Sequence, residues 1–258
     1  MSNPVVAEGT AAPESAAPKA NKPPRSLYVA LVVLVVIAAT FAVVAVRLKN
    51  SQQAAPTLRA SGVPQNISTH IANLMALTPT VAHPAPNFTL IDQNGHTVSL
   101  SSFRGKVVVL EFMDPHCTDI CPIVSQEFID ANHYLGKNAS KVVFLAVNVN
   151  QYFASVADVA KFTTEHRLNT IPSWHFLTGA VSRLPSIWGA YGVQVEAPNP
   201  NADIIHTSVM YFIDPSGQER YIADPVVDHT SKGTAFLPAT SLVAWGRGIA
   251  LTAKDLVK

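Results

Sequence analysis

The chain contains two cysteines, Cys117 and Cys121, and both lie in the short stretch HCTDICP at residues 116–122. Three residues separate the thiols, and a proline follows the second one. Two thiols at this spacing could form a structural disulfide, a redox-active pair or part of a metal-binding site. A purely structural disulfide is the weakest of these interpretations, because closing so small a loop removes little chain entropy.

Pro122 is expected at the first position of a helix, where its missing N–H costs nothing. Cys121 would then occupy the N-cap, and Cys117 would lie in the preceding loop. The free N–H groups and the positive end of the helix dipole are expected to stabilise a Cys121 thiolate and lower its pKa. This environment predicts a reactive or metal-binding pair.

A third residue separates redox chemistry from metal binding. Redox domains that carry a cysteine pair at the start of a helix usually have two residues between the cysteines. They usually also have a proline just before the strand that faces the cysteines. Here there are three residues, and His206 occupies the position before the strand. Two thiolates and an imidazole suit copper, especially Cu(I), whereas a closed zinc site needs a fourth protein ligand. Cys117, Cys121 and His206 are therefore candidate copper ligands, and the two cysteines are also a candidate catalytic redox pair.

Other side chains that could bind metal or act on the cysteines are expected to have supporting or structural roles. His116 is expected to tune the neighbouring thiol rather than bind metal, and His175 to pack within a strand. Met113 and Met210 lie on predicted strands and are expected in the core. Asp119 is expected to cap the helix. The remaining histidines are explained by solvent exposure.

Composition excludes several classes of function. The 258-residue chain is 48% hydrophobic and 14% charged, with a formal net charge of +1. These values disfavour a disordered chain and a nucleic-acid-binding protein, which needs a clustered basic face. The sequence contains no nucleophile elbow, phosphate loop or dinucleotide fingerprint. Hydrolase, kinase and dehydrogenase functions therefore have no support.

The chain divides into four regions. Residues 1–26 predict a disordered tail, rich in Pro and Ala. Residues 27–46 contain no charge and are long enough, at about 30 Å, for an uncleaved transmembrane anchor. Residues 47–82 are expected to form a tether, and residues 83–258 the folded domain. With its N-terminus inside, such a protein would place this domain outside the cytoplasm, and a bacterial membrane fits better than a mitochondrial one.

The sequence of the folded domain, residues 83–258, predicts an α/β fold. KVVVLEFM (106–113) and KVVFLAVNVN (141–150) are β-branched runs typical of strands buried on both faces. Asn94-Gly95 indicates a hairpin. Strands alternate with helical patterns, an antiparallel pair follows, and residues 238–257 predict a closing helix. This order suggests a thioredoxin-like fold, in which a central mixed sheet is flanked by helices. The loop at residues 223–237 is long for such a domain.

Three motifs in order resemble the Sco/SenC family of copper chaperones. They are HCTDICP at residues 116–122, WHFLTG at 174–179 and HTSVMYFIDPSG at 206–217. Three motifs together are more specific than any one alone. The chain departs from the family beside Asp114-Pro115, where an aromatic residue and a threonine are usual, and in its long loop at 223–237.

The resemblance implies a copper metallochaperone that faces the periplasm from a single-pass anchor in the bacterial inner membrane. Cys117, Cys121 and His206 would bind copper, and only the dithiol form would do so. The partner would be the copper-binding subunit of cytochrome c oxidase, whose Cu(A) site would receive copper or have its cysteines reduced. Another copper protein is the alternative client. A membrane-tethered thiol–disulfide oxidoreductase and a redox or copper sensor remain alternative functions.

Overall fold

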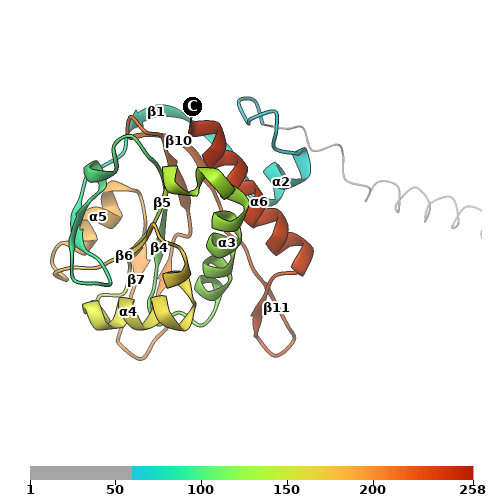
Figure 1. Ribbon diagram of the computed structural model, residues 1–258. Coiled ribbons are helices and arrows are strands. Elements are labelled where there is room, and N and C mark those ends of the chain that lie inside the picture. The colour runs from blue at the N-terminus through green and yellow to red at the C-terminus, as the bar shows by residue number, and fades with distance from the viewer. Residues whose placement is uncertain (1–59, 258) are drawn as a thin grey trace, which may run out of the picture. The chain divides into compact units, whose positions relative to one another are not determined.

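The sheet that organises the domain has six strands in the order β1-β10-β9-β4-β5-β6. It is seen in a computed structural model that describes residues 60–257 (Figure 1). Its strands are β1 (Thr78–Pro84), β4 (Val107–Met113), β5 (Val142–Asn148), β6 (Trp174–Leu177), β9 (Met210–Ile213) and β10 (Gln218–Ala223). The helices are α2 (Thr69–Leu74), α3 (Ile120–Leu135), α4 (Val156–Glu165), α5 (Leu184–Ala190) and α6 (Ala239–Leu256). Three two-stranded hairpins pair β2 (Thr89–Ile91) with β3 (Thr97–Ser99), β7 (Val195–Glu196) with β8 (Ile205–His206), and β11 (Asp228–His229) with β12 (Ala235–Phe236).

Strand directions confirm the predicted mixed sheet. β4, β5 and β6 are mutually parallel, whereas β9 is antiparallel to β4 and to β10. All seven residues of β4 and all seven of β5 are buried, as expected for β-branched runs between two layers. This is a thioredoxin-like α/β fold with helices on both faces of the sheet.

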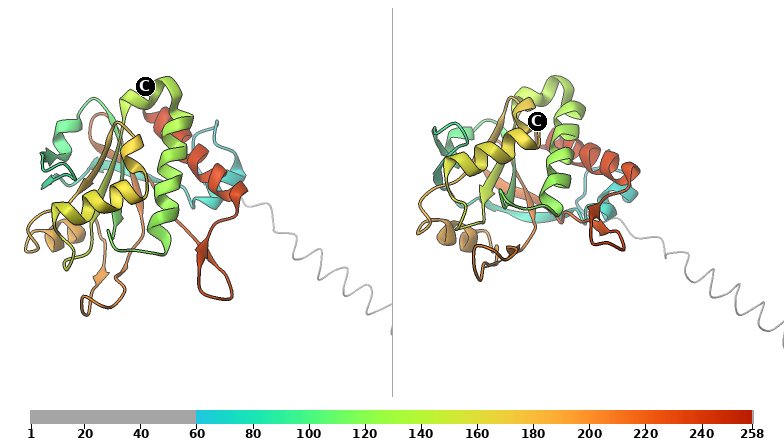
Figure 2. Two further views of the ribbon diagram at one scale, coloured as in Figure 1. Left: turned by 60° about the horizontal axis from the view of Figure 1, so that its bottom comes forward. Right: turned by 90° about the horizontal axis from the view of Figure 1, so that it is seen from below.

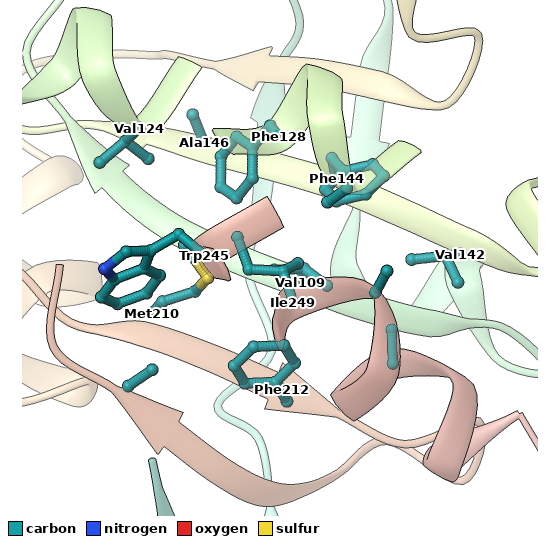
Figure 3. Close-up of a cluster of buried hydrophobic side chains, with 14 of the residues drawn as sticks. Val109, Val124, Phe128, Val142, Phe144, Ala146, Met210, Phe212, Trp245 and Ile249 are labelled. Carbon is teal, nitrogen blue, oxygen red and sulfur yellow. The ribbon is translucent and has the colours of Figure 1, made fainter. Parts of the chain in front are cut away.

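Two hydrophobic cores lie on opposite faces of the sheet because alternate residues of a strand point in opposite directions. Val109 of β4 belongs to the core beneath α3 and α6, and the next residue, Leu110, belongs to the core beneath α5. Figure 3 shows the first core, where Phe128 of α3 and Trp245 of α6 face the sheet. Cys121 belongs to the same core, so the packing of α3 fixes where the cysteine loop ends.

The folded unit begins earlier than expected. Within the predicted tether, α2 packs against α6, and β1 pairs with β10 at the edge of the sheet. Ile67 and Met75 are fully buried in the first core. The expected boundary at His83 therefore falls inside β1. The sequence TPTVAHP lacks an alternating apolar pattern, which is why β1 is not evident from residue types.

The predicted N-terminal tail, the transmembrane anchor and residues 47–59 of the tether lie outside the described residues. Within residues 60–257, no helix combines the length and the apolar character needed to cross a membrane. The long segment 223–237, expected to be a loop, contains the β11–β12 hairpin.

Candidate metal centre

The cysteine loop connects the end of β4 to the start of α3, and Asp114 organises it. The Asp114 carboxylate accepts hydrogen bonds from the His116 backbone N–H at 2.8 Å and the Asn150 side chain at 2.9 Å. The Asp114 carbonyl accepts a bond from the Cys117 N–H at 3.1 Å. These bonds tie the loop to the segment after β5, so Cys117 has a defined position.

The helix begins two residues earlier than predicted. Its N-cap is Asp119 and its first residue is Ile120, so Cys121 and Pro122 occupy the second and third positions. Pro122 still costs nothing there, since the first N–H groups of a helix have no intrahelical partner. The Asp119 side chain makes no capping bond, so its expected role as a side-chain cap is wrong.

The two thiols are free and adjacent. The backbone N–H of Cys121 donates to Sγ of Cys117 at 3.4 Å. Cys117 is half-buried, whereas Cys121 is 2% exposed. A molecule that enters the site from solvent therefore contacts Cys117 before Cys121.

Their acidities differ in a direction opposite to the prediction for Cys121. The thiol of Cys121 and the backbone N–H groups of Cys121 and Asp119 lower the pKa of Cys117 to about 7, against an opposing effect of burial. The Cys121 thiol donates a hydrogen bond to Cys117, and this bond, together with burial, holds the proton and raises the pKa of Cys121 well above its ordinary value. The helix N-terminus thus stabilises a thiolate at Cys117, because that sulfur accepts hydrogen bonds from the free N–H groups of the first turn.

His206 lies in β8, on the β7–β8 hairpin. The hairpin is closed at its base by Thr207, whose N–H donates to the Gln194 carbonyl at 3.0 Å. Nδ1 of His206 donates to the Thr207 carbonyl at 3.0 Å, which leaves Nε2 as the lone-pair nitrogen. Burial lowers the pKa of His206, while the Thr207 carbonyl and the Asp114 carboxylate oppose the change. The ring is therefore neutral at pH 7, as a metal ligand must be.

Asp114 is the group that relates the three predicted ligands. Its charge acts on the pKa values of Cys117, Cys121 and His206, so all three lie within its electrostatic range. However, no group of three or more His, Cys, Asp or Glu side chains in residues 60–257 is arranged to hold a metal ion. The structure brings the two sulfurs together and leaves His206 on a neighbouring hairpin, so the three-ligand set remains a prediction.

The other residues singled out from the sequence have structural partners. His116 stacks on Phe153 with ring centroids 3.5 Å apart, and its Nε2 lies 3.7 Å from the Asp158 carboxylate. Met113 and Met210 are buried in the first core, where Met210 lies beside Trp245 (Figure 3). Met113 and Met210 therefore have the core positions expected of them, whereas the expected effect of His116 on the neighbouring thiol stays a prediction.

His175 is half-buried and packs against Phe103, with the two ring centroids 5.4 Å apart. Its Nδ1 lies 3.1 Å from the Asp92 carboxylate. A packed strand histidine was expected, and the buried carboxylate partner is an addition to that prediction.

Two features near the site were missed. His229 is not simply exposed, because its Nε2 lies 2.7 Å from the carboxylate of Asp119, the residue midway between the cysteines. Glu111 of β4 and Glu127 of α3 are buried carboxyls without well-formed hydrogen bonds. No residue pattern indicates the first pair, whose members lie 110 positions apart. The interruption of the apolar run VVVLEFM by Glu111 is a signal for the second.

Sequence comparison relates the chain to one family. A family model described as SCO1/SenC matches residues 78–232. The SCO1 protein homolog of Bacillus subtilis (strain 168) is 27% identical over 133 residues, which make up 51% of this chain and 68% of that protein. Residues 78–232, which the family model matches, include the cysteine loop and the β7–β8 hairpin.

Two solved structures share the fold. The copper-bound ScoI of Bradyrhizobium japonicum aligns with a TM-score of 0.51 and 23% identity, over 67% of this chain and 99% of that one. BsSco, a member of the Sco family of cytochrome c oxidase assembly proteins in which a disulfide switch was identified, aligns with a TM-score of 0.53 and 22% identity. That alignment covers 70% of this chain and 96% of BsSco.

Proposed function

The chain belongs to the SCO1/SenC family, and on this premise we propose that it binds copper and delivers it during cytochrome c oxidase assembly. Cys117, Cys121 and His206 are the proposed ligands. The observation that carries this proposal is the pair of adjacent thiols, one of which titrates near pH 7, with a neutral imidazole on the next hairpin. The family membership and the copper-bound relative support it.

The donor set fits copper in its chemistry. Thiolate sulfur and neutral imidazole are the ligands that Cu(I) prefers among protein side chains. Cys117 supplies a thiolate near neutral pH, and Cys121 has to lose its proton on binding, so affinity is expected to rise with pH. Because His206 and the two cysteines are not arranged to hold a metal ion together in residues 60–257, binding requires a rearrangement that brings His206 to the two sulfurs.

Copper affinity tests the ligand set. The reduced full-length chain is titrated anaerobically against a chromophoric Cu(I) chelator, together with the variants His206→Ala and Cys121→Ser. We expect one copper per chain and a loss of affinity of about tenfold or more in each variant, since each tenfold is 1.4 kcal/mol. His133→Ala, at an exposed position on α3, is the matched control. Equal affinity in the wild type and His206→Ala overturns the three-ligand site.

A specific observation also favours thiol–disulfide exchange. Cys117 is accessible and its pKa is lowered to about 7, whereas Cys121 is buried and protonated. The Cys117 thiolate would attack a disulfide sulfur of the client and displace one client thiolate, and Cys121 would then displace the other, leaving a 117–121 disulfide. Retention of this activity in His206→Ala, together with absence of copper binding, would place the oxidoreductase function first.

We further propose that residues 27–46 anchor the protein in a bacterial inner membrane with the folded domain on the periplasmic side. The support is the length and uncharged character of this run. Protease added to intact spheroplasts should degrade the domain, whereas protection of the domain until lysis would contradict this orientation.

A further inference from the structure

The segment Asp224–Leu237, called here the arm, carries the β11–β12 hairpin. The Thr230 N–H donates to the Thr234 carbonyl at 2.9 Å near its tip, and the Thr230 hydroxyl accepts the Thr234 N–H at 3.1 Å. Figures 1 and 2 show the arm projecting beyond the N-terminal end of α3, on the same side of the molecule as the β7–β8 hairpin. The arm and that hairpin therefore flank the cysteine loop.

The arm has an inner face anchored to the site. Partners directly opposite in an antiparallel pair share a face, so His229 and Ala235 lie together and Leu237 follows on the same side. His229 bonds Asp119 at 2.7 Å, and Leu237 packs against the first core. The backbone N–H of Asp119 also helps to stabilise the Cys117 thiolate. The arm is thus connected to the cysteine loop through one residue.

The outer face carries the exposed apolar side chains of Val226 and Phe236 beside the exposed Asp228 carboxylate. Asp228 pairs with Phe236, and Val226 continues the alternation on that side. The side chains of Val226 and Phe236 are 44% and 41% exposed. Across the cysteine loop, Ile205 beside His206 is 67% exposed. Apolar side chains grouped on projecting elements mark an interaction surface more often than scattered ones do.

The charges around these apolar residues are mostly negative. In residues 193–207 and 224–237 the exposed charged side chains are four carboxylates and one ammonium group. They are Glu196, Asp203, Asp224, Asp228 and Lys232. Such a surface attracts a partner whose contacting face is basic.

We propose that the arm and the β7–β8 hairpin form the docking surface for the protein that exchanges copper with Cys117 and Cys121, and that this partner presents a basic face with an apolar centre. Val226 and Phe236 contact the apolar centre, and the carboxylates contact the basic rim. This inference rests on the proposed function for the identity of the partner. Because His229 holds Asp119, docking on the arm acts directly beside the copper-binding sulfurs.

The probe is the isolated copper-binding domain of the organism's own cytochrome c oxidase. Its affinity for the full-length chain is measured by titration calorimetry for the wild type and the double variant Val226→Ser with Phe236→Ser. Val81→Ser is the matched control, because Val81 is 90% exposed and lies on β1 at the other end of the sheet in Figure 1. Circular dichroism confirms that each variant is folded.

We expect the arm double variant to bind the domain about tenfold or more weakly, as for loss of a central apolar contact, and Val81→Ser to bind like the wild type. A second double variant, Asp224→Asn with Asp228→Asn, should bind more weakly and lose part of the salt dependence of the wild type. Tighter binding by this variant overturns the assignment of a basic partner face.

Copper loading is measured separately on the same samples, which distinguishes the two proposals. Loss of domain binding in the arm variant, in a chain that takes up no copper, supports the docking surface and overturns the copper function. Copper uptake with equal domain binding in wild type and arm variant, or with no domain binding at all, overturns the docking surface alone. Self-association of the wild type that the arm variant abolishes, without domain binding, assigns the surface to a second copy and also overturns the proposal.

Discussion

Glu111 makes the stability of the protein depend on pH. Its side chain is 1% exposed in the middle of β4, and burial raises its pKa to about 8. Ser208 opposes this rise, but neither Glu111 oxygen has a well-formed hydrogen bond. Glu127 of α3 is buried nearby, and burial followed by the charge of Glu111 raises its pKa well above the ordinary value. The perturbation we consider is Glu111→Gln, which keeps the shape and removes the ionisation.

The magnitude follows from the difference between the folded and unfolded pKa values. In the unfolded chain Glu111 titrates near 4.5, and in the folded protein near 8. The folded state therefore holds a proton that the unfolded state has lost, and stability decreases as pH rises through this window. At 1.36 kcal/mol per pKa unit, the loss is about 2.5 kcal/mol between pH 5 and pH 7. Below pH 4.5 the effect of Glu111 disappears.

Urea unfolding at pH 5, 6 and 7 measures this effect. The free energy of unfolding of the wild type should fall relative to that of Glu111→Gln by about 2.5 kcal/mol across the series. Titrating groups that do not interact with Glu111 are common to both proteins and cancel in the difference. Glu165→Gln, at an exposed position on α4, is the matched control and should leave the wild-type slope unchanged. A wild-type curve parallel to that of Glu111→Gln would refute the reasoning, since it would mean that Glu111 is solvated or paired.

Three further predictions address the site and the packing around it. Iodoacetamide should alkylate Cys117 with a midpoint near pH 7, and Cys121→Ala should move the midpoint upward because the donor that lowers the Cys117 pKa is lost; an unchanged midpoint would contradict this cause. Gly246→Ala should destabilise the protein by about 1–3 kcal/mol, since the added Cβ would lie 2.6 Å from Cβ of Asp130, whereas Gly189→Ala meets no neighbouring atom; thermal unfolding that shows equal effects would exclude the close approach of α6 to α3. Ser155→Ala should cost about 1 kcal/mol in urea unfolding, because Ser155 caps α4 through the Asp158 N–H, and a loss below a few tenths would show that the capping box is not formed in solution.

Local patterns predict the elements that carry the site. The runs that became β4 and β5 consist of residues that favour strands buried on both faces, and the Asn94-Gly95 turn does connect β2 to β3. The cysteine loop is found where the sequence predicts it, between a strand and a helix. These features depend on neighbours a few residues apart, which the sequence displays directly.

Features that depend on residues far apart in the chain are harder to predict from the sequence. The lowered pKa was predicted for Cys121 and is found at Cys117, because it depends on a two-residue shift in the start of α3 and on which sulfur accepts the Cys121 N–H. The contact between His229 and Asp119 joins segments 110 positions apart. The pairing of β1 with β10 places a strand in a segment with two prolines. Each of these requires the tertiary fold before it can be argued.

The position of β4 has a consequence for hydrogen exchange. This strand is bonded to β5 on one side and β9 on the other, and all seven of its residues are buried. Its amide hydrogens therefore exchange with deuterium only when the whole sheet opens, whereas the short strands of the arm exchange through local opening. Cys121 lies between these regimes, in the first turn of α3. Fraying of that single turn would expose its sulfur while β4 beneath it stays closed, so a change in the redox state of the pair would not require unfolding of the domain.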